Sequence, residues 1–507
     1  MKILIIMPRL YPFTQKEDYN YQFQLGISYI SSIVKKEGYD ITCLNMNHYS
    51  GSIESILYNV VKNYDIVMSG NIWMGFKVMQ EIVRVTRLYS KAKIILGGSM
   101  ITSDPFNTMK ILKPDYGIIS EGENTIIELL KHIENPTELP KGVAYLENNE
   151  VKMTEARELI ETLDDLPYPD FEGFEFERYL DNMYVNQWYW NNTTDYPRAY
   201  SIIGSRGCPF NCTFCYQSLG KKYRKRSVKS IIDEIKWAIE KYKINVINLM
   251  DDTFAIDQES LSEFADEIKK LNVRWCCQLS VMKVNDEILK KLKESGCDVI
   301  SYGFESYSPI VLKSMKKPIT SERIDFAIKE TLKAGIGIQG NFIFGDPAET
   351  KETFEETLNY WKNNCEGQVN LFFVEPFAGS EIFKYCIDKG IIKDRVKYMS
   401  EDILHANFFN MTQMSDEEFK EITEIVFINQ NLGYIKYSIP KEIKRNEKRL
   451  DRLDIKVDCP YCKNENNYKN FYSDRPLWRQ KIMCRNCYYR FNILSPIFQN
   501  IDIQTGA

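Results

Sequence analysis

Apolar residues in the first 140 positions form short runs, separated by stretches where they recur every three or four residues. The runs have the length of buried strands, and the stretches between them, such as residues 26–37, have helical spacing. Strand and helix in alternation predict a parallel sheet covered on both faces, which is a doubly wound, Rossmann-like α/β domain over residues 1–140. Gly97 and Gly98 directly follow one strand, where such a sheet holds its ligand crevice, although two glycines can also simply turn the chain.

Residues 141–198 lack this alternation and are expected to be a linker. They contain a hairpin pattern around Asn148–Asn149 and two prolines within 166–170 that break regular structure. The aromatic cluster Trp188–Trp190 either lines a substrate cleft or packs between domains.

The alternation of strand and helix resumes at residue 199 and continues to about residue 400. Six apolar strands with helices between them predict a partial parallel (β/α)6 barrel, with its site at the carboxyl ends of the strands. Residues 401–457 are expected to be a helical extension, in which the densely charged stretch 437–456 forms a solvated helix or a linker. A small four-cysteine metal ribbon over 458–495 follows.

The composition fits a folded multidomain protein, because 44% of the 507 residues are hydrophobic and 27% are charged. The net charge of −5 argues against general nucleic-acid or membrane-surface binding. No apolar run is long enough to span a bilayer, and Met1–Met7 is too short for a signal peptide, so the cytoplasm is the expected compartment. There the thirteen cysteines are expected to be metal ligands or buried thiols rather than disulfides.

Three cysteines lie within the segment Arg206-Gly-Cys-Pro-Phe-Asn-Cys-Thr-Phe-Cys-Tyr-Gln217. They are Cys208, Cys212 and Cys215, in a Cys-x3-Cys-x2-Cys pattern directly after the first barrel strand. Three thiolates occupy three corners of a four-iron cube and leave one iron open to a ligand that is not protein. A zinc site or unrelated thiols are the alternatives.

With Phe214 as its aromatic residue, this pattern resembles the signature of the radical S-adenosylmethionine (SAM) superfamily. The resemblance implies that the open iron binds the amino and carboxylate groups of SAM. An electron from the reduced 4Fe-4S cluster then cleaves SAM and yields a 5′-deoxyadenosyl radical, which abstracts a hydrogen from the substrate. The electron would come from a donor such as flavodoxin or ferredoxin.

The same resemblance implies cofactor contacts at the ends of the later barrel strands. The candidate residues are Asp251, Asp252, Gln278, Ser280 and Glu305. Some of these positions could be helix caps instead, as is expected of Asp257 and Thr320. Many relatives have an arginine after the third strand where this chain has Val281-Met-Lys283, which leaves the contact to the carboxylate of SAM unassigned.

The order of the two domains resembles the cobalamin-binding subfamily, as do Gln24–Ser28, Gly97-Gly98 and Glu121–Thr125. That subfamily holds cobalamin in the first domain, facing the cluster, and many members transfer a methyl group to an unactivated carbon. The Asp-x-His-x-x-Gly motif that supplies a cobalt ligand in some cobalamin folds is absent, and His48 is expected to be a surface residue. Some relatives keep the domain without the cofactor.

Four further cysteines form two Cys-x2-Cys pairs near the end of the chain: Cys459, Cys462, Cys484 and Cys487. Two such pairs close a tetrahedral four-sulfur site, for which zinc is the default metal and a rubredoxin-like iron the alternative. Between residues 459 and 490, seven Lys or Arg stand against two acids, with aromatic residues interleaved. This face could bind nucleic acid, an acidic lipid or a carrier protein, but solvated charge over a small core is the preferred interpretation.

The leading hypothesis is a cobalamin-dependent radical SAM methyltransferase that acts on a carbon of a specialised metabolite, lipid or peptide. The second is a cobalamin-free radical enzyme that forms C–C bonds or rings. The layout resembles the archaeal tetraether-lipid synthases, but those carry further clusters, and no third cysteine group is seen here. A non-catalytic metal-binding or nucleic-acid-docking protein is the third hypothesis, against which the intact triad of cysteines argues.

Overall fold

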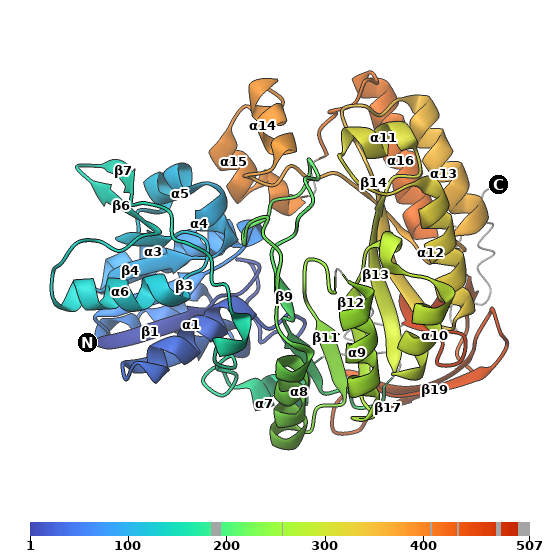
Figure 1. Ribbon diagram of the computed structural model, residues 1–507, viewed down its shortest axis with the longest axis horizontal. Coiled ribbons are helices and arrows are strands. Elements are labelled where there is room, and N and C mark those ends of the chain that lie inside the picture. Colours follow the sequence, from blue (N-terminus) through green and yellow to red (C-terminus); the bar gives the residue numbers. More distant parts are fainter. Residues whose placement is uncertain (184–193, 256, 406–407, 433–435, 473–477, 495–507) are drawn as a thin grey trace.

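The computed structural model describes residues 1–183, 194–255, 257–405, 408–432, 436–472 and 478–494. Figure 1 shows the N-terminal domain and a larger barrel side by side, with the C-terminal ribbon below the barrel. Helices α14 (Glu381–Asp388) and α15 (Arg395–Ser400) lie above the seam between the two domains (Figure 1). None of the helices that the structure describes combines the length and the apolar composition that crossing a membrane requires.

The N-terminal domain is built on one seven-stranded sheet in the order β2-β1-β3-β4-β5-β6-β7. Its first five strands are parallel, as the alternating pattern predicts. They are β1 (Lys2–Met7), β2 (Asp40–Asn45), β3 (Ile66–Gly70), β4 (Lys93–Gly97) and β5 (Tyr116–Ile118). The connecting helices are α1 (Leu25–Lys36), α2 (Ile53–Leu57), α3 (Phe76–Tyr89), α4 (Ser99–Ser103), α5 (Pro105–Leu112) and α6 (Glu123–Glu134).

The predicted hairpin is confirmed, and it belongs to the first sheet. Strands β6 (Val143–Glu147) and β7 (Glu150–Met153) pair antiparallel and extend the sheet beyond β5. Asn148 and Asn149 make the turn at φ +53° and +65°, a conformation that asparagine tolerates better than most residues. Residues up to 153, placed in the linker by the sequence, therefore form part of the N-terminal sheet.

The barrel consists of six parallel strands in the order β15-β14-β13-β12-β11-β8. They are β8 (Ala199–Ile202), β11 (Val246–Leu249), β12 (Arg274–Gln278), β13 (Cys297–Glu305), β14 (Gly337–Phe344) and β15 (Asn370–Phe373). The barrel is open, because β8 and β15 do not pair with each other in the part of the chain that the structure describes. This confirms the predicted fold, with the helices α8 (Val228–Tyr242), α9 (Gln258–Lys269), α10 (Asp286–Glu294), α11 (Pro309–Ser314), α12 (Ser321–Lys333) and α13 (Lys351–Asn364).

Two of the helices that cover the barrel begin at the predicted caps. The side chain of Asp257 accepts a hydrogen bond from the backbone N–H of Ser260 at the start of α9. Thr320 does the same for Arg323 at the start of α12. Each cap satisfies one N–H that the first helical turn cannot pair.

The expectation of a helical extension over 401–457 is only partly met. Helix α16 (Asp416–Leu432) packs against β15, but the charged stretch 437–456 contains strands, not a helix. In β18 (Arg452–Asp458), buried and half-buried residues largely alternate, a two-residue period that the density of charge obscured. The other ribbon strands are β16 (Tyr437–Ser438), β17 (Glu442–Arg445), β19 (Glu465–Tyr472), β20 (Trp478–Met483) and β21 (Arg490–Leu494).

The ribbon closes the amino end of the barrel. Met483 packs with Cys276 and Val299, which lie on β12 and β13. Its sulfur leaves no room for a side chain on Gly337, the first residue of β14, where a Cβ would lie 2.6 Å away. Tyr488 adds to this contact, because its hydroxyl accepts a hydrogen bond from the guanidinium of Arg274 at 2.7 Å. The ribbon is therefore the floor of the barrel, opposite the carboxyl ends of the strands.

A buried group of charges fastens the N-terminal domain to the barrel. Glu121 accepts hydrogen bonds from Arg206 at 2.9 Å and from Arg224 at 2.8 Å, and Glu123 accepts one from Arg206 at 2.6 Å. These four side chains are at most 7% exposed. Buried opposite charges tolerate their desolvation only when each has its partners. The four residues, named the interdomain charge cluster below, therefore fix the two domains in one arrangement.

Glu121→Gln should loosen the arrangement of the domains, because it leaves buried guanidinium charge uncompensated. Removing one partner of a buried pair costs about 3–5 kcal/mol, and the melting temperature should fall by several degrees. The matched control is Glu161→Gln, which breaks the ion pair to Lys222, whose two side chains are 60% and 64% exposed. Differential scanning fluorimetry compares the two variants, and an equal effect of both would contradict the role given to the cluster.

Candidate active site

The three-cysteine loop begins at the carboxyl end of β8 and is closed at its base. Strands β9 (Ser205–Arg206) and β10 (Arg224–Lys225) pair antiparallel on either side of it. Gly207 sits at φ +81°, where a Cβ would lie 2.4 Å from the carbonyl oxygen of Lys222. Only glycine fits such a position, so the turn brings Cys208 into the loop directly after the strand pair.

The outer end of the loop is held by two elements from later in the chain. The backbone N–H of Thr213 donates to the carbonyl of Met315, just after α11, at 3.1 Å. The carbonyl of Thr213 accepts from the N–H of Ile382 in α14 at 2.9 Å. The loop is therefore held at both ends, and the fixed residue Thr213 lies between Cys212 and Cys215.

A lysine stands beside the thiols. Lys317 lies 6.0 Å from the centre of the Phe214 ring, and its side chain is 18% exposed. Burial raises the pKa of Cys208 and Cys212, while the positive charge of Lys317 opposes that rise. Bound iron would oppose it far more strongly, because a metal ion keeps its thiol ligands deprotonated.

Glu305 is the partner of Lys317 and ends β13 in an unusual backbone conformation. Its carboxylate accepts a hydrogen bond from Lys317 Nζ at 2.8 Å, and its φ is +62°. A Cβ on Gly303 would lie 2.5 Å from both the carboxylate of Glu305 and the Nζ of Lys317. Gly303 thus makes room for this ion pair inside the barrel, next to the cysteine loop. A strained residue at such a place is typical of a functional site.

The other predicted contacts lie at this end of the barrel with different partners. Asp251 is 1% exposed and accepts hydrogen bonds from the Gly204 N–H and the Ser205 hydroxyl, so it braces the start of the loop. Asp252 is exposed, and its charge contributes to the raised pKa of Cys208 and of Cys215. Gln278 is half-buried, and Ser280 caps the 3-10 turn Val281–Lys283. Their contacts to a cofactor stay predictions.

Gly97 and Gly98 lie at the carboxyl end of β4, at the edge that adjoins the cysteine loop. Gly98 has φ +88°, and a Cβ there would lie 2.7 Å from the carbonyl oxygen of Asn71. Helix α4 begins at the next residue and ends at Ser103. A Cβ on Gly379 would meet both Ser103, at 2.8 Å, and the Tyr216 ring, at 2.5 Å. The crevice edge of the first sheet thus lies next to the residue that follows Cys215.

The prediction that His48 is a surface residue is wrong. Its side chain is fully buried, with hydrogen-bond partners in Tyr21 at 3.0 Å and Glu175 at 3.2 Å. Burial lowers its pKa, so the ring is held as a neutral packing element. The chain after residue 153 folds back over this position, which no local pattern shows. The cluster Trp188–Trp190 lies outside the described residues.

The four C-terminal cysteines come together as predicted. The sulfur atoms of Cys459, Cys462, Cys484 and Cys487 all lie within 4.8 Å of one another. Each pair has the same turn: the N–H groups of Lys463 and Tyr488 donate to the carbonyls of Cys459 and Cys484, both at 3.0 Å. Among the described residues no other group of metal-binding side chains is this compact. The triad needs no such compactness, because the thiolates of a cluster bind different irons.

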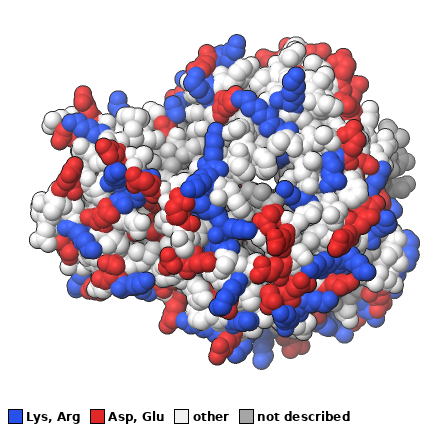
Figure 2. Space-filling model, viewed as in Figure 1, with Lys and Arg blue, Asp and Glu red and all other residues white. Residues whose placement is uncertain are grey.

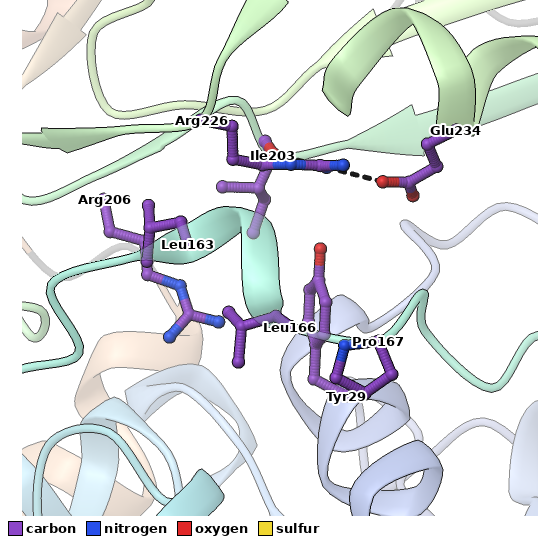
Figure 3. Close-up of a pocket in the computed structure, with 8 residues that line it drawn as sticks. All are labelled: Tyr29, Leu163, Leu166, Pro167, Ile203, Arg206, Arg226 and Glu234. Atoms are coloured by element: carbon purple, nitrogen blue, oxygen red, sulfur yellow. Dashed lines mark hydrogen bonds and ion pairs between the residues drawn. The ribbon is translucent and has the colours of Figure 1, made fainter. Parts of the chain in front are cut away.

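The cavity shown in Figure 3 lies beside the interdomain charge cluster and is too small for a ligand. Its volume is about 10 Å³, the space of one water molecule. Tyr29 projects into it, and the Arg226–Glu234 ion pair, at 2.5 Å, forms one wall (Figure 3). It is a packing gap between the domains.

Three residues of the site were not found from the sequence: Arg206, Arg224 and Lys317. Arg206 directly precedes Gly207-Cys208, and Arg224 lies in the basic run 221–226, so both are adjacent to the motif. Figure 2 shows a band of Lys and Arg along the seam between the domains. Within the run 221–226, Lys221, Lys222 and Lys225 are exposed. Of the two buried arginines in this run, Arg224 binds Glu121 of the N-terminal domain and Arg226 pairs with Glu234 within the barrel. Sequence alone does not separate these buried residues from the exposed lysines beside them.

Comparison with known proteins agrees with this geometry. Residues 202–360 match the family model of the radical SAM superfamily. An uncharacterized methyltransferase of Pyrococcus horikoshii, PH0819, is 28% identical over 433 residues, which is 82% of this chain and 90% of the relative. Cytidylyl-2-hydroxyethylphosphonate methyltransferase of Streptomyces wedmorensis is 23% identical, over 73% and 79% of the two chains.

A solved structure shares most of this fold. It is the radical SAM methyltransferase TsrM of Kitasatospora setae, determined with cobalamin and a 4Fe-4S cluster bound. The TM-score is 0.61 at 15% identity, over 77% of this chain and 75% of that one. This chain therefore contains a radical SAM domain, the type of domain that binds a 4Fe-4S cluster and SAM, and is a radical SAM enzyme related to methyltransferases.

Proposed function

We propose that this enzyme is a cobalamin-dependent methyltransferase that adds a methyl group to an unactivated carbon of a small anionic or amphipathic molecule. The observation that supports this most directly is the interdomain charge cluster. Arg206 lies two residues before Cys208 and is bound to Glu121 and Glu123 of the first domain. The crevice edge of that domain is thereby fixed against the cysteine loop, which is the arrangement that two cofactors acting on one substrate require.

In this proposal Cys208, Cys212 and Cys215 bind three irons of the cluster. The loop fits the group because its base and its outer end are both fixed, and because Lys317 supplies positive charge beside the thiolates. When bound, the cluster and SAM supply one-electron cleavage chemistry and a carbon radical. The residues of the barrel then position SAM and exclude water, with Glu305 and Lys317 beside the loop.

The carboxyl edge of the first sheet offers an open edge and some apolar surface to a large cofactor. Gly97 and Gly98 keep this edge free of side chains, and two large apolar residues near it are exposed, Phe13 (67%) and Ile72 (50%). Phe13 follows β1 and Ile72 follows β3, so both belong to loops at this edge. Exposed apolar residues at a crevice are typical of a ligand site. Cobalamin bound there would supply a methyl carrier opposite the cysteine loop.

Alanine at any one of Cys208, Cys212 or Cys215 should abolish cleavage of SAM to 5′-deoxyadenosine and lower the iron content, since two thiolates do not hold the cluster. Cys43→Ala is the matched control, because Cys43 is a half-buried free thiol far from the motif in sequence. Iron analysis and chromatographic assay of 5′-deoxyadenosine under reducing, anaerobic conditions test both. Cleavage that survives loss of a triad cysteine would exclude the proposed ligand set.

Protein purified anaerobically with hydroxocobalamin supplied should retain about one cobalt per chain. Gly98→Ala should lower the cobalt content, because a Cβ there would lie 2.7 Å from the carbonyl oxygen of Asn71 and displace the crevice loop. Gly390→Ala is the control: it also has positive φ, +69°, but open space around its Cβ. Absorption spectra and cobalt analysis compare the two variants. No bound cobalt in the wild type, with ring-closed or C–C-coupled products, would instead support a cobalamin-free radical enzyme.

Cys484→Ser should remove one metal ion per chain from the ribbon and leave the triad iron in place. The ribbon core is small, so loss of its metal should also lower the melting temperature and expose the floor of the barrel. Metal analysis identifies the ion as zinc or iron. A variant with unchanged metal content would show that the four cysteines are not a metal site.

A further inference from the structure

A cavity of about 330 Å³ lies between the open edge of the barrel and the ribbon. Its walls come from β14, β15, α16 and the ribbon strands β20 and β21. The lining residues include the amides Gln339, Asn370, Gln430, Asn431 and Asn492, the cations Lys481 and Arg490, and the aromatic residues Phe372, Phe373, Phe408 and Phe427. The volume is within the range of small-molecule sites in proteins.

The chemistry of the lining is one-sided. Among the described residues that line it there are two cations and no carboxylate, and the neutral polar groups are all amides. The apolar part is mostly aromatic, and two of these rings are substantially exposed: Phe372 (38%) and Phe427 (46%). A cavity of this kind fits an anionic group attached to an apolar body that also forms hydrogen bonds.

Arg490 is the group that most needs a ligand. Only 7% of it is exposed, and its two terminal nitrogens donate to Gln339 Oε1, at 3.2 Å, and to the carbonyl oxygen of Gln368. Its Nε has no hydrogen-bond partner among the described residues, and the same is true of Oδ1 of Asn492, which is 3% exposed. Burial lowers the pKa of Arg490 to about 10.

The contrast with the interdomain arginines is informative. Arg206 and Arg224 are as deeply buried as Arg490, but each is bound to a carboxylate. No ion pair to Arg490 is found among the described residues. A buried guanidinium without a counter-charge is costly, and its planar fork matches a carboxylate or a phosphate.

The register of the strands places this cavity on the path to the cysteine loop. Gln339, which binds Arg490, is paired with Ser301 on β13, and Asn341, which contacts Asn370, is paired with Gly303. A bulge shifts the register after Gly303, and the carboxylate of Glu305 lies over Gly303, where a Cβ would be 2.5 Å from it. Ser301 and Glu305 are four residues apart, which corresponds to about 13 Å along a strand. A small molecule bound at Arg490 can therefore extend up the barrel to the Glu305–Lys317 pair.

We propose that this cavity is the site for the anionic end of the substrate, with the ribbon residue Arg490 binding a carboxylate or phosphate and the phenylalanines contacting the apolar body. The identification of this ligand as the substrate depends on the proposed function, whereas the binding itself does not. The four-cysteine ribbon thus contributes directly to substrate recognition, in addition to closing the barrel.

Isothermal titration of the anaerobically reconstituted full chain with benzoate, phenyl phosphate and neutral benzyl alcohol tests the site. At least one of the anions should bind, and the tighter one identifies the recognised group. Benzyl alcohol should bind much more weakly. Arg490→Met should weaken binding of the anion by about tenfold or more, because a charge-assisted fork is lost. Lys481→Gln should weaken it several-fold.

The matched control is Arg485→Gln, which removes one positive charge from the ribbon at a residue that pairs with Asp195 and does not line the cavity. It should leave anion binding unchanged. Cys215→Ala should also bind normally, so that failure of the radical chemistry is distinguished from failure of the anion site. If Arg490→Met does not fold, the comparison of anion binding between Lys481→Gln and the wild type tests the proposal instead. Equal binding by wild type and the deciding variant, equal binding of benzyl alcohol, or no binding of either anion would overturn the proposal.

Discussion

The buried contact of Glu121 and Glu123 with Arg206 and Arg224 is the interaction on which the arrangement of the site depends. It joins the residue before the cysteine motif to the loop that follows β5 of the other domain. Hydrophobic packing between the domains excludes water but is non-directional, so it tolerates sliding. Hydrogen bonds between planar guanidinium and carboxylate groups are directional and do not tolerate sliding. They define one position of the cysteine loop relative to the crevice.

With the domains fixed, the interior of the barrel is organised in layers along the strands. Met483 packs at the amino end, and Arg490, its partner across the two ribbon strands, lies beside it in the wall of the cavity. The Glu305–Lys317 pair and the cysteine loop lie toward the carboxyl end. The polar groups thus change along the barrel from amides with two cations near the ribbon to an ion pair beside the cysteines. In the proposed site, this order directs the anionic end of a ligand toward the ribbon and its other end toward the cysteine loop.

The sequence predicts the parts of this structure that depend on local pattern. Alternating strands and helices, the Asn148–Asn149 turn, the caps at Asp257 and Thr320, and the four-cysteine site were all predicted correctly, because each is set by neighbouring residues. The surface position of His48 and the solvated helix or linker over 437–456 were wrong. A distant segment decides the position of His48, since residue 175 covers it, whereas over 437–456 the pairing of β17 with the neighbouring strand β18 overrides the density of charge. Arg490 resembles His48, since its surroundings are formed by the distant strands β14 and β15.

The position of the ribbon bears on what its metal does. Val299, which touches the ribbon, and Glu305, near the cysteine loop, are six residues apart on β13, a separation of about 20 Å. A metal below the floor of the barrel is therefore poorly placed to pass electrons to the cluster, and a structural role fits better. The ribbon nevertheless also contributes to the cavity. Cys487 and Arg490 are three residues apart, so the turn that contains this cysteine also determines where the guanidinium lies. The four-cysteine site and the proposed anion site are thereby linked through one short segment of backbone.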